Sequence, residues 1–143
     1  MSKGDTYEND LQKLLFNATA IANIADNAAS SPLTNLYVGL HTADPGEAGN
    51  QTTSETAYTG YARVAVARTS GGWTVTTNSV SPVAAITFGE CTASAGGAIT
   101  HAVVGTVSSG TGKILYSGTL TPNITMAVGV IPQIKTTSTI TED

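Results

Sequence analysis

The stretch that decides the fold runs from Asn35 to Arg63 and reads NLYVGLHTADPGEAGNQTTSETAYTGYAR. At its start, apolar side chains alternate with other residues in the period of a β-strand that has one buried face. The predicted core positions of this strand are Leu36, Val38 and Leu40. The positions between them place Tyr37 and His41 on the opposite face, where we expect both side chains to be exposed or to contact a neighbouring protein.

A long polar segment, residues 42–60, follows this strand. It opens with Asp44-Pro45-Gly46, which is typical of a tight turn because Asp caps the turn, proline fixes φ and glycine permits the conformation that follows. Loops of this length in a compact domain are usually functional or mobile. On the next strand, Tyr61 and Arg63 share one face, and these residue types are enriched at protein–protein interfaces. The pair therefore either covers the sheet surface or belongs to an interface.

Short segments rich in β-branched and aromatic residues continue to the C-terminus, separated by glycine and proline. We predict further strands at residues 61–69, 73–77, 83–88, 99–104, 114–116, 124–130 and 134–141. The helical segment precedes the strands and does not interleave with them, which argues against an α/β topology. We therefore expect a mainly β protein: an antiparallel β-sandwich or jelly-roll-like barrel preceded by one N-terminal α-helix.

The N-terminal segment carries apolar residues at helical spacing, which predicts a helix at residues 6–28. The stripe that we expect to pack against another surface includes Leu11, Leu14 and Leu15. A Ser-Ser-Pro sequence then ends the pattern. We accordingly divide the chain into an N-terminal helical arm, residues 1–32, and a β-sandwich domain, residues 33–143.

Composition removes several classes of function. The chain has 143 residues, 41% of them hydrophobic and only 11% charged, and its net charge is −4. Six lysines and arginines cannot form the basic surface that a nucleic-acid backbone requires, and no apolar run is long enough to cross a membrane. We therefore expect no nucleic-acid and no membrane partner. A surface so poor in charge instead favours association with other proteins.

Candidate catalytic residues are few. Cys91 could act as a nucleophile only with His41 or His101 as its base, and a lone cysteine at a strand end is more typically a small core residue. The acidic residues of the 42–60 loop match no EF-hand calcium site in their spacing. We therefore expect no enzymatic activity, no metal ion and no cofactor.

Residues 35–49, NLYVGLHTADPGEAG, and residues 60–63, GYAR, together resemble a family of small virion proteins of tailed bacteriophages. Members of this family are often labelled tail fibre or decoration-like proteins. The resemblance implies a short N-terminal helix, a strand, a polar loop and a second strand, followed by further β-strands. Gly39 departs from the family pattern, in which alanine is commoner at this position.

The resemblance implies a non-enzymatic structural protein of a tailed-phage virion. Within that class we first expect a capsid decoration (cement) protein that binds the lattice of the major capsid protein and stabilises the head, because a charge-poor β-domain with an arm suits that role. One alternative is a tail-associated protein, such as a fibre or adaptor component. A less favoured alternative is a receptor- or carbohydrate-binding module built on Trp73 and the tyrosines.

The expected partners are the major capsid protein or other virion proteins, together with further copies of this chain in a dimer or trimer. We expect the protein to be located in the virion, on the capsid surface or on the tail. The candidate interface residues are Leu11, Leu14, Leu15, Tyr37, His41, Asp44, Tyr61 and Arg63.

Overall fold

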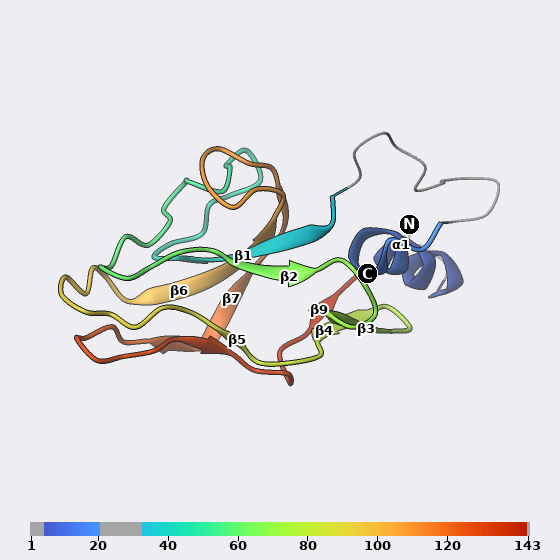
Figure 1. Cartoon of the computed structure of the whole chain (residues 1–143). Coiled ribbons are helices and arrows are strands. Elements are labelled where there is room, and N and C mark those ends of the chain that lie inside the picture. The colour runs from blue at the N-terminus through green and yellow to red at the C-terminus, as the bar shows by residue number, and fades with distance from the viewer. Residues whose placement is uncertain (1–4, 21–32, 143) are drawn as a thin grey trace. The chain divides into compact units, whose positions relative to one another are not determined.

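The computed structural model describes the backbone of residues 5–20 and 33–142 and the side chains of residues 9–20 and 33–142 (Figure 1). Within these residues there is one helix, α1 (Asp5–Asn17). The strands are β1 (Asn35–His41), β2 (Val64–Ala67), β3 (Trp73–Thr76), β4 (Ser79–Pro82), β5 (Ile86–Thr87), β6 (Ile99–Gly105), β7 (Ile114–Ile124), β8 (Gln133–Ile134) and β9 (Ile140–Thr141). The sheets are antiparallel, and none of those formed by the described residues closes into a barrel. The prediction of a mainly β protein with one N-terminal helix is confirmed, without the barrel form.

The chain divides into two compact units. Unit 1 comprises Met1–Asn35, Val66–Ala85 and Lys135–Asp143, and unit 2 comprises Leu36–Ala65 and Ile86–Ile134. Unit 1 thus combines the N-terminal helix with strands from the middle and the end of the sequence, so the division between the units does not follow residue 32. An additional role of the N-terminal segment as an arm on another protein stays a prediction.

In unit 1, α1 packs against the small sheet with the strand order β3–β4–β9. The contact centres on two buried aromatic rings, Phe16 and Trp73, which meet edge to face with centroids 4.7 Å apart. The predicted leucine stripe is only half-buried, and the fully buried positions of the described helix are Gln12 and Phe16. The most buried face of the helix is therefore the one that carries Gln12 and Phe16, and not the predicted stripe of leucines.

The helix is also shorter than predicted. It ends at Asn17, residues 18–20 are not helical, and residues 21–28 of the predicted helix lie outside the described residues. Ala18 adopts a left-handed backbone conformation with φ of 53°, which turns the chain out of the helix. The alanines that follow Asn17 in the sequence did not predict that the helix ends there, because alanine is a strong helix former.

Two sets of hydrogen bonds cap the end of the helix. The amide of Thr19 donates to the carbonyl of Lys13 (3.1 Å), so the residue after the left-handed Ala18 satisfies a carbonyl of the last helical turns. The guanidinium of Arg68 donates to the carbonyls of Leu14 and Leu15. A cation at this position also interacts favourably with the negative end of the helix dipole.

Unit 2 is built on the sheet with the strand order β2–β1–β6–β7. β1 and β6 pair continuously from Tyr37↔Gly105 to His41↔His101. The best-buried apolar side chains of these two strands are Leu36, Val38, Leu40, Ile99 and Val103. The prediction that alternate residues of the first strand fill the core is therefore confirmed.

Several predicted strands have different bounds. The segment 83–88 lies after β4, and only β5 forms within it, while residues 125–130 form no strand. β7 continues through Pro122, which lies between the strands predicted at residues 114–116 and 124–130. The strand continues because residues 120–123 have no partner in the β6 register, so a proline there removes no ladder hydrogen bond. A proline at a bulged edge position does not end a strand.

Candidate functional site

The polar loop after β1 folds back beside the strand that it leaves. The amide of Thr42 donates to the carbonyl of Ser54, and the amide of Thr56 donates to the carbonyl of Leu40 (both 2.9 Å). Between these two bonds, Glu55 forms an isolated β-bridge with His41. The loop therefore extends the sheet beside the end of β1. It also places the carboxylate of Glu55 next to this sheet.

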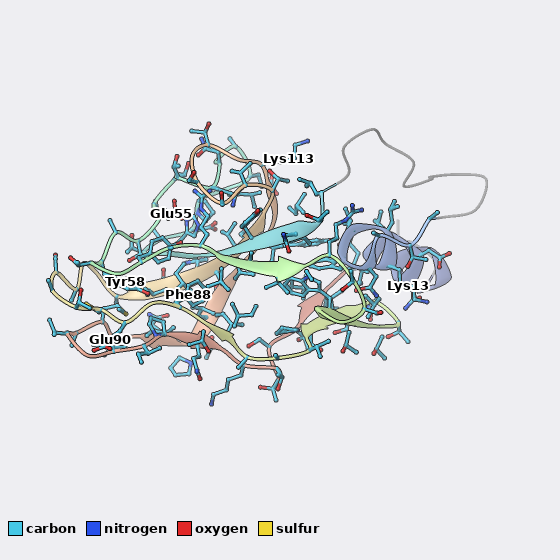
Figure 2. All side chains as sticks on the ribbon, in the orientation of Figure 1. Lys13, Glu55, Tyr58, Phe88, Glu90 and Lys113 are labelled. Atoms are coloured by element: carbon cyan, nitrogen blue, oxygen red, sulfur yellow. The ribbon has the colours of Figure 1, made fainter. Side chains whose placement is uncertain are left out.

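Glu55 and Arg63 form a two-pronged ion pair in unit 2 (Figure 2, Glu55 labelled). Arg63 donates from Nε to Oε1 and from Nη2 to Oε2 of Glu55, both at 2.7 Å. It also donates to the carbonyls of Val107 (3.1 Å) and Gly110 (3.0 Å). The side chains of Arg63 and Glu55 are 3% and 15% exposed, and the hydrogen bonds with Glu55 raise the pKa of the guanidinium. The pair joins the 42–60 loop, the segment before β2 and the β6–β7 loop.

Tyr61 completes this buried cluster. Its hydroxyl donates to Oε1 of Glu55 (2.8 Å) and accepts a hydrogen bond from the amide of Leu40 (3.0 Å). Its ring stacks on Phe88 and meets Tyr58 edge to face, and burial raises the pKa of its hydroxyl. A Cβ atom at Gly39 would lie 3.2 Å from this hydroxyl, so the absence of a side chain there leaves room for the Tyr61 contact.

His41 is fully buried, and Nδ1 of its ring lies 2.8 Å from the carbonyl of Thr53. Because a carbonyl oxygen only accepts, Nδ1 carries the proton in the neutral ring. Nε2 has no hydrogen-bond partner among the described residues. Burial is the main cause that lowers the pKa of His41, so the neutral imidazole is the favoured form.

Gln51 is a buried connector that the sequence analysis did not identify. Its Oε1 accepts hydrogen bonds from the amides of Thr106 (2.9 Å) and Val107 (3.0 Å), and its Nε2 donates to the carbonyl of Val107 (3.2 Å). A Cβ atom at Gly105 or Gly112 would lie 2.1 Å from the Gln51 side chain. These two glycines flank the hairpin loop and are the sequence signal that could have indicated a close approach.

The predicted interface residues of unit 2 do not share one exposed surface. We expected His41 to be exposed or to contact a neighbouring protein, and the first of these is wrong, because its side chain is fully buried and is hydrogen-bonded to Thr53 of the 42–60 loop. Arg63 is buried in an internal ion pair rather than at the protein surface. Asp44 is exposed, and its carboxylate accepts the amide hydrogen of Gly46 (2.9 Å), as the predicted turn requires.

The remaining candidates are placed separately. Tyr37 is half-buried on β1, and the three leucines, Leu11, Leu14 and Leu15, lie on α1 in unit 1. Contacts of these residues with another protein stay predictions. Trp73, which we considered as part of a carbohydrate platform, is 2% exposed in the core of unit 1 and offers no surface for a sugar ring. Cys91 is fully buried, as expected of a small core residue.

The cluster has an evident effect on the fold of unit 2. The side chains of Arg63, Glu55 and Gln51 are hydrogen-bonded to one another or to the backbone, so they fasten two loops to a sheet. The particular family follows from the sequence: the family model described as podophage GP4 fiber I protein gp80 matches residues 5–141, and the chain belongs to this family. No curated protein matches the chain.

This family assignment agrees with the resemblance to virion proteins of tailed phages. A fibre protein family fits the tail-associated alternative better than capsid decoration. Among the described residues, no helix is both long enough and apolar enough to span a membrane.

Proposed function

We propose that this protein is a structural component of a podophage tail fibre. The observation that carries the proposal is the match of nearly the whole chain, residues 5–141, to a podophage fibre protein family. This reverses the order of our two expectations, because capsid decoration came first in the sequence analysis. The capsid role remains the competing assignment within the same class of virion proteins.

The buried cluster of unit 2 supports a structural role. Arg63 and Gln51 both bind the backbone of Val107, so the 42–60 loop and the β6–β7 loop are fastened at a common point. Loops that are already ordered lose little conformational entropy when they bind a partner. Such a unit suits a particle component that must keep its shape while it holds neighbouring subunits.

We further propose that the protein has no catalytic activity. Three of the described side chains that could supply a nucleophile, a base or an acid are engaged within the fold. Cys91 is fully buried with its Sγ 3.6 Å from the carbonyl of Ser94, His41 is fully buried against Thr53, and Glu55 is paired with Arg63. These arrangements leave no substrate-facing nucleophile–base pair among these residues.

The copy number in purified virions tests the assignment. Quantitative mass spectrometry of virions should give a ratio of a few per cent to the major capsid protein, and antibody labelling should mark the tail. Removal of the protein should leave the heat resistance of the head unchanged. A ratio near one to one, with a loss of head stability on removal, would instead assign the protein to capsid decoration.

A further inference from the structure

The outer edge of β7 is an open edge of the sheet of unit 2 (Figure 1, orange strand). β7 comes last in the strand order β2–β1–β6–β7, so only its side toward β6 pairs with another described strand. Residues 117–119 in its middle are all exposed. The edge of a sheet carries backbone donors and acceptors that a further strand can use.

The hydrogen bonds of β1 decide which backbone groups reach this edge. The carbonyl of Leu40 accepts the amide hydrogen of Thr56 (2.9 Å), and the amide of Leu40 donates to the hydroxyl of Tyr61 (3.0 Å). Both groups of Leu40 therefore point away from β6. Because opposed residues of antiparallel strands point their backbone groups the same way relative to the pair, Ala102, the partner of Leu40, points its own groups toward β7.

The same alternation continues from β6 to β7. Ala102 is opposite Gly118, so the backbone groups of Gly118 point toward β6. The register is regular from His101↔Thr119 to Val104↔Tyr116, and both of its irregularities lie outside this stretch. The backbone N–H and C=O groups of Ser117 and Thr119, the two neighbours of Gly118, therefore point to the open edge.

The edge of β7 lacks the usual protection against a further strand. Proteins commonly protect such edges with charged residues, proline or a short strand. β7 has 11 residues and none of them is charged, and its Pro122 lies outside the regular register. At the other edge of the sheet, β2 has only 4 residues and lies between Arg63 and Arg68. Of the two edges, β7 is the one suited to pairing.

Gly118 supplies an independent observation. A Cβ atom at this position would meet no other atom within 4 Å, and the φ of Gly118 lies outside the left-handed region. The contacts of the described chain therefore do not require glycine here, although glycine weakens the interior of a strand. A glycine inside a strand often marks a position that another backbone approaches closely.

We propose that the outer edge of β7 pairs with the same edge of a second copy of this chain. A two-fold axis at Gly118 places Ser117 of one copy opposite Thr119 of the other, so their outward N–H and C=O groups exchange hydrogen bonds. The two Gly118 residues then face each other as a pair without hydrogen bonds, in which the Cα atoms are only about 4.5 Å apart.

A second copy is the favoured occupant because this arrangement makes the edge complementary to itself. The outward residues are placed evenly on the two sides of Gly118, as an antiparallel pair of identical strands requires, and the residue without a side chain lies where the two backbones come closest. The association goes beyond the fibre assignment, since it names the edge through which the chains associate, and it does not depend on that assignment.

Amide hydrogen exchange of the full-length chain at increasing protein concentration tests the pairing. The amides of Ser117 and Thr119 should exchange at least about tenfold more slowly when the chain is associated than when it is monomeric. The amide of Gly118 is the internal control, because it points to β6 and should exchange at the same rate at every concentration. Sedimentation equilibrium over the same range should show a reversible dimer.

Substitutions at Ser117 separate the backbone from the side chain. Ser117→Pro removes an outward N–H and leaves the pairing with β6 intact, so it should raise the dissociation constant of the dimer by about tenfold. Ser117→Ala is the matched control, because it keeps the N–H, and it should associate like the wild type. Thermal melting verifies that each variant is folded. If Ser117→Pro does not fold, Ser117→Lys should weaken the dimer instead, since a lysine protects an edge.

Several results would overturn the inference: a monomeric wild-type chain, Ser117 and Thr119 amides whose exchange does not change with concentration, or a folded Ser117→Pro variant that associates like the wild type. An equal loss of association in Ser117→Ala would also overturn it, because the contact would then belong to the side chain. The fibre assignment is decided separately, by the copy number in virions.

Discussion

Two glutamines, one in each unit, are equally buried and differ in what their amides contact. Gln51 in unit 2 and Gln12 in unit 1 are both 1% exposed. Gln51 makes three hydrogen bonds to the backbone of the β6–β7 loop. Neither the nitrogen nor the oxygen of the Gln12 amide has a partner among the described residues. A buried amide is therefore fully used in one unit, whereas in the other it is buried without a hydrogen bond to any described residue, which costs stability.

The difference extends to the surrounding side chains. Unit 2 buries Arg63 with its carboxylate and carbonyl partners in place. Unit 1 is centred on the contact between Phe16 and Trp73, and the indole nitrogen of Trp73 has no hydrogen-bond partner among the described residues. We therefore expect unit 2 to be sensitive to the loss of polar groups and unit 1 to tolerate or benefit from it.

The largest effect should come from Arg63→Met. The substitution leaves the Glu55 carboxylate buried without its partner, and breaking a buried ion pair in this way costs about 3–5 kcal/mol. The free energy of unfolding from denaturant titration measures the loss. Lys113→Met is the control, because Lys113 is exposed on the neighbouring loop and should change stability little. A loss in Arg63→Met as small as that of the control would show that the ion pair does not hold the loops.

The next largest effect should come from Gln51→Leu. It removes the acceptor of the Val107 amide and one of the two acceptors of the Thr106 amide, which also donates to the carbonyl of Lys113 (3.2 Å). Leaving a donor of this half-buried loop unpaired costs about 1–3 kcal/mol. Hydrogen exchange of the Thr106 and Val107 amides should accelerate with the loss of stability. The exposed Gln133 offers a matched control as Gln133→Leu. Equal exchange rates in wild type and Gln51→Leu would contradict the proposed connection between the loops.

Gln12→Leu should have the opposite sign. Because the Gln12 amide has no partner to lose among the described residues, an apolar side chain of similar size should stabilise unit 1 by about 1–2 kcal/mol. Hydrogen exchange of the described α1 amides, residues 9–17, should slow in the variant. If Gln12→Leu is destabilising, the wild-type amide has a partner such as a bound water, and the contrast with Gln51 fails.

Sequence reasoning predicted the regular parts of this fold and missed the contacts between distant residues. The alternation at Leu36, Val38 and Leu40 is local, and it correctly located β1 and its buried face. The pairing of Glu55 with Arg63 depends on how the loop folds back, and no periodic pattern encodes it. The same limit explains why two residues of an expected surface, His41 and Arg63, are buried.

The buried imidazole of His41 should make unit 2 sensitive to acid. Because its pKa is lowered from 6.5 in the folded protein, the unfolded chain binds more protons below this pH. The contribution to stability is complete above about pH 6.5 and is lost as the pH falls, by at most about 1.4 kcal/mol at about pH 5.5. His41→Asn should flatten the pH dependence measured by denaturation, whereas His101→Asn should retain it. Equal slopes in the wild type and His41→Asn would refute this role.

The smallest effect should come from a substitution at the end of α1. This prediction compares the backbone conformation of one residue in each unit. Ala18 in unit 1 and Ser54 in unit 2 both have a left-handed φ, 53° and 57° respectively. Such a conformation costs an L-residue about 1 kcal/mol relative to glycine, and glycine is the usual residue at this helix-end position. Ala18→Gly should therefore stabilise unit 1 by somewhat less than about 1 kcal/mol, since glycine also loses more entropy on folding.

Thermal unfolding followed by circular dichroism at the helical wavelength measures this change. Ala20→Gly is the matched control, because it makes the same substitution two residues further along the same exposed segment, where there is no left-handed φ to relieve. The control should be neutral or slightly destabilising, because there the added glycine only increases the entropy lost on folding. A stabilisation of equal size in both variants would mean that the left-handed turn at Ala18 does not end the helix in solution. A gain confined to Ala18→Gly would instead establish this backbone conformation as the physical reason that α1 stops at Asn17.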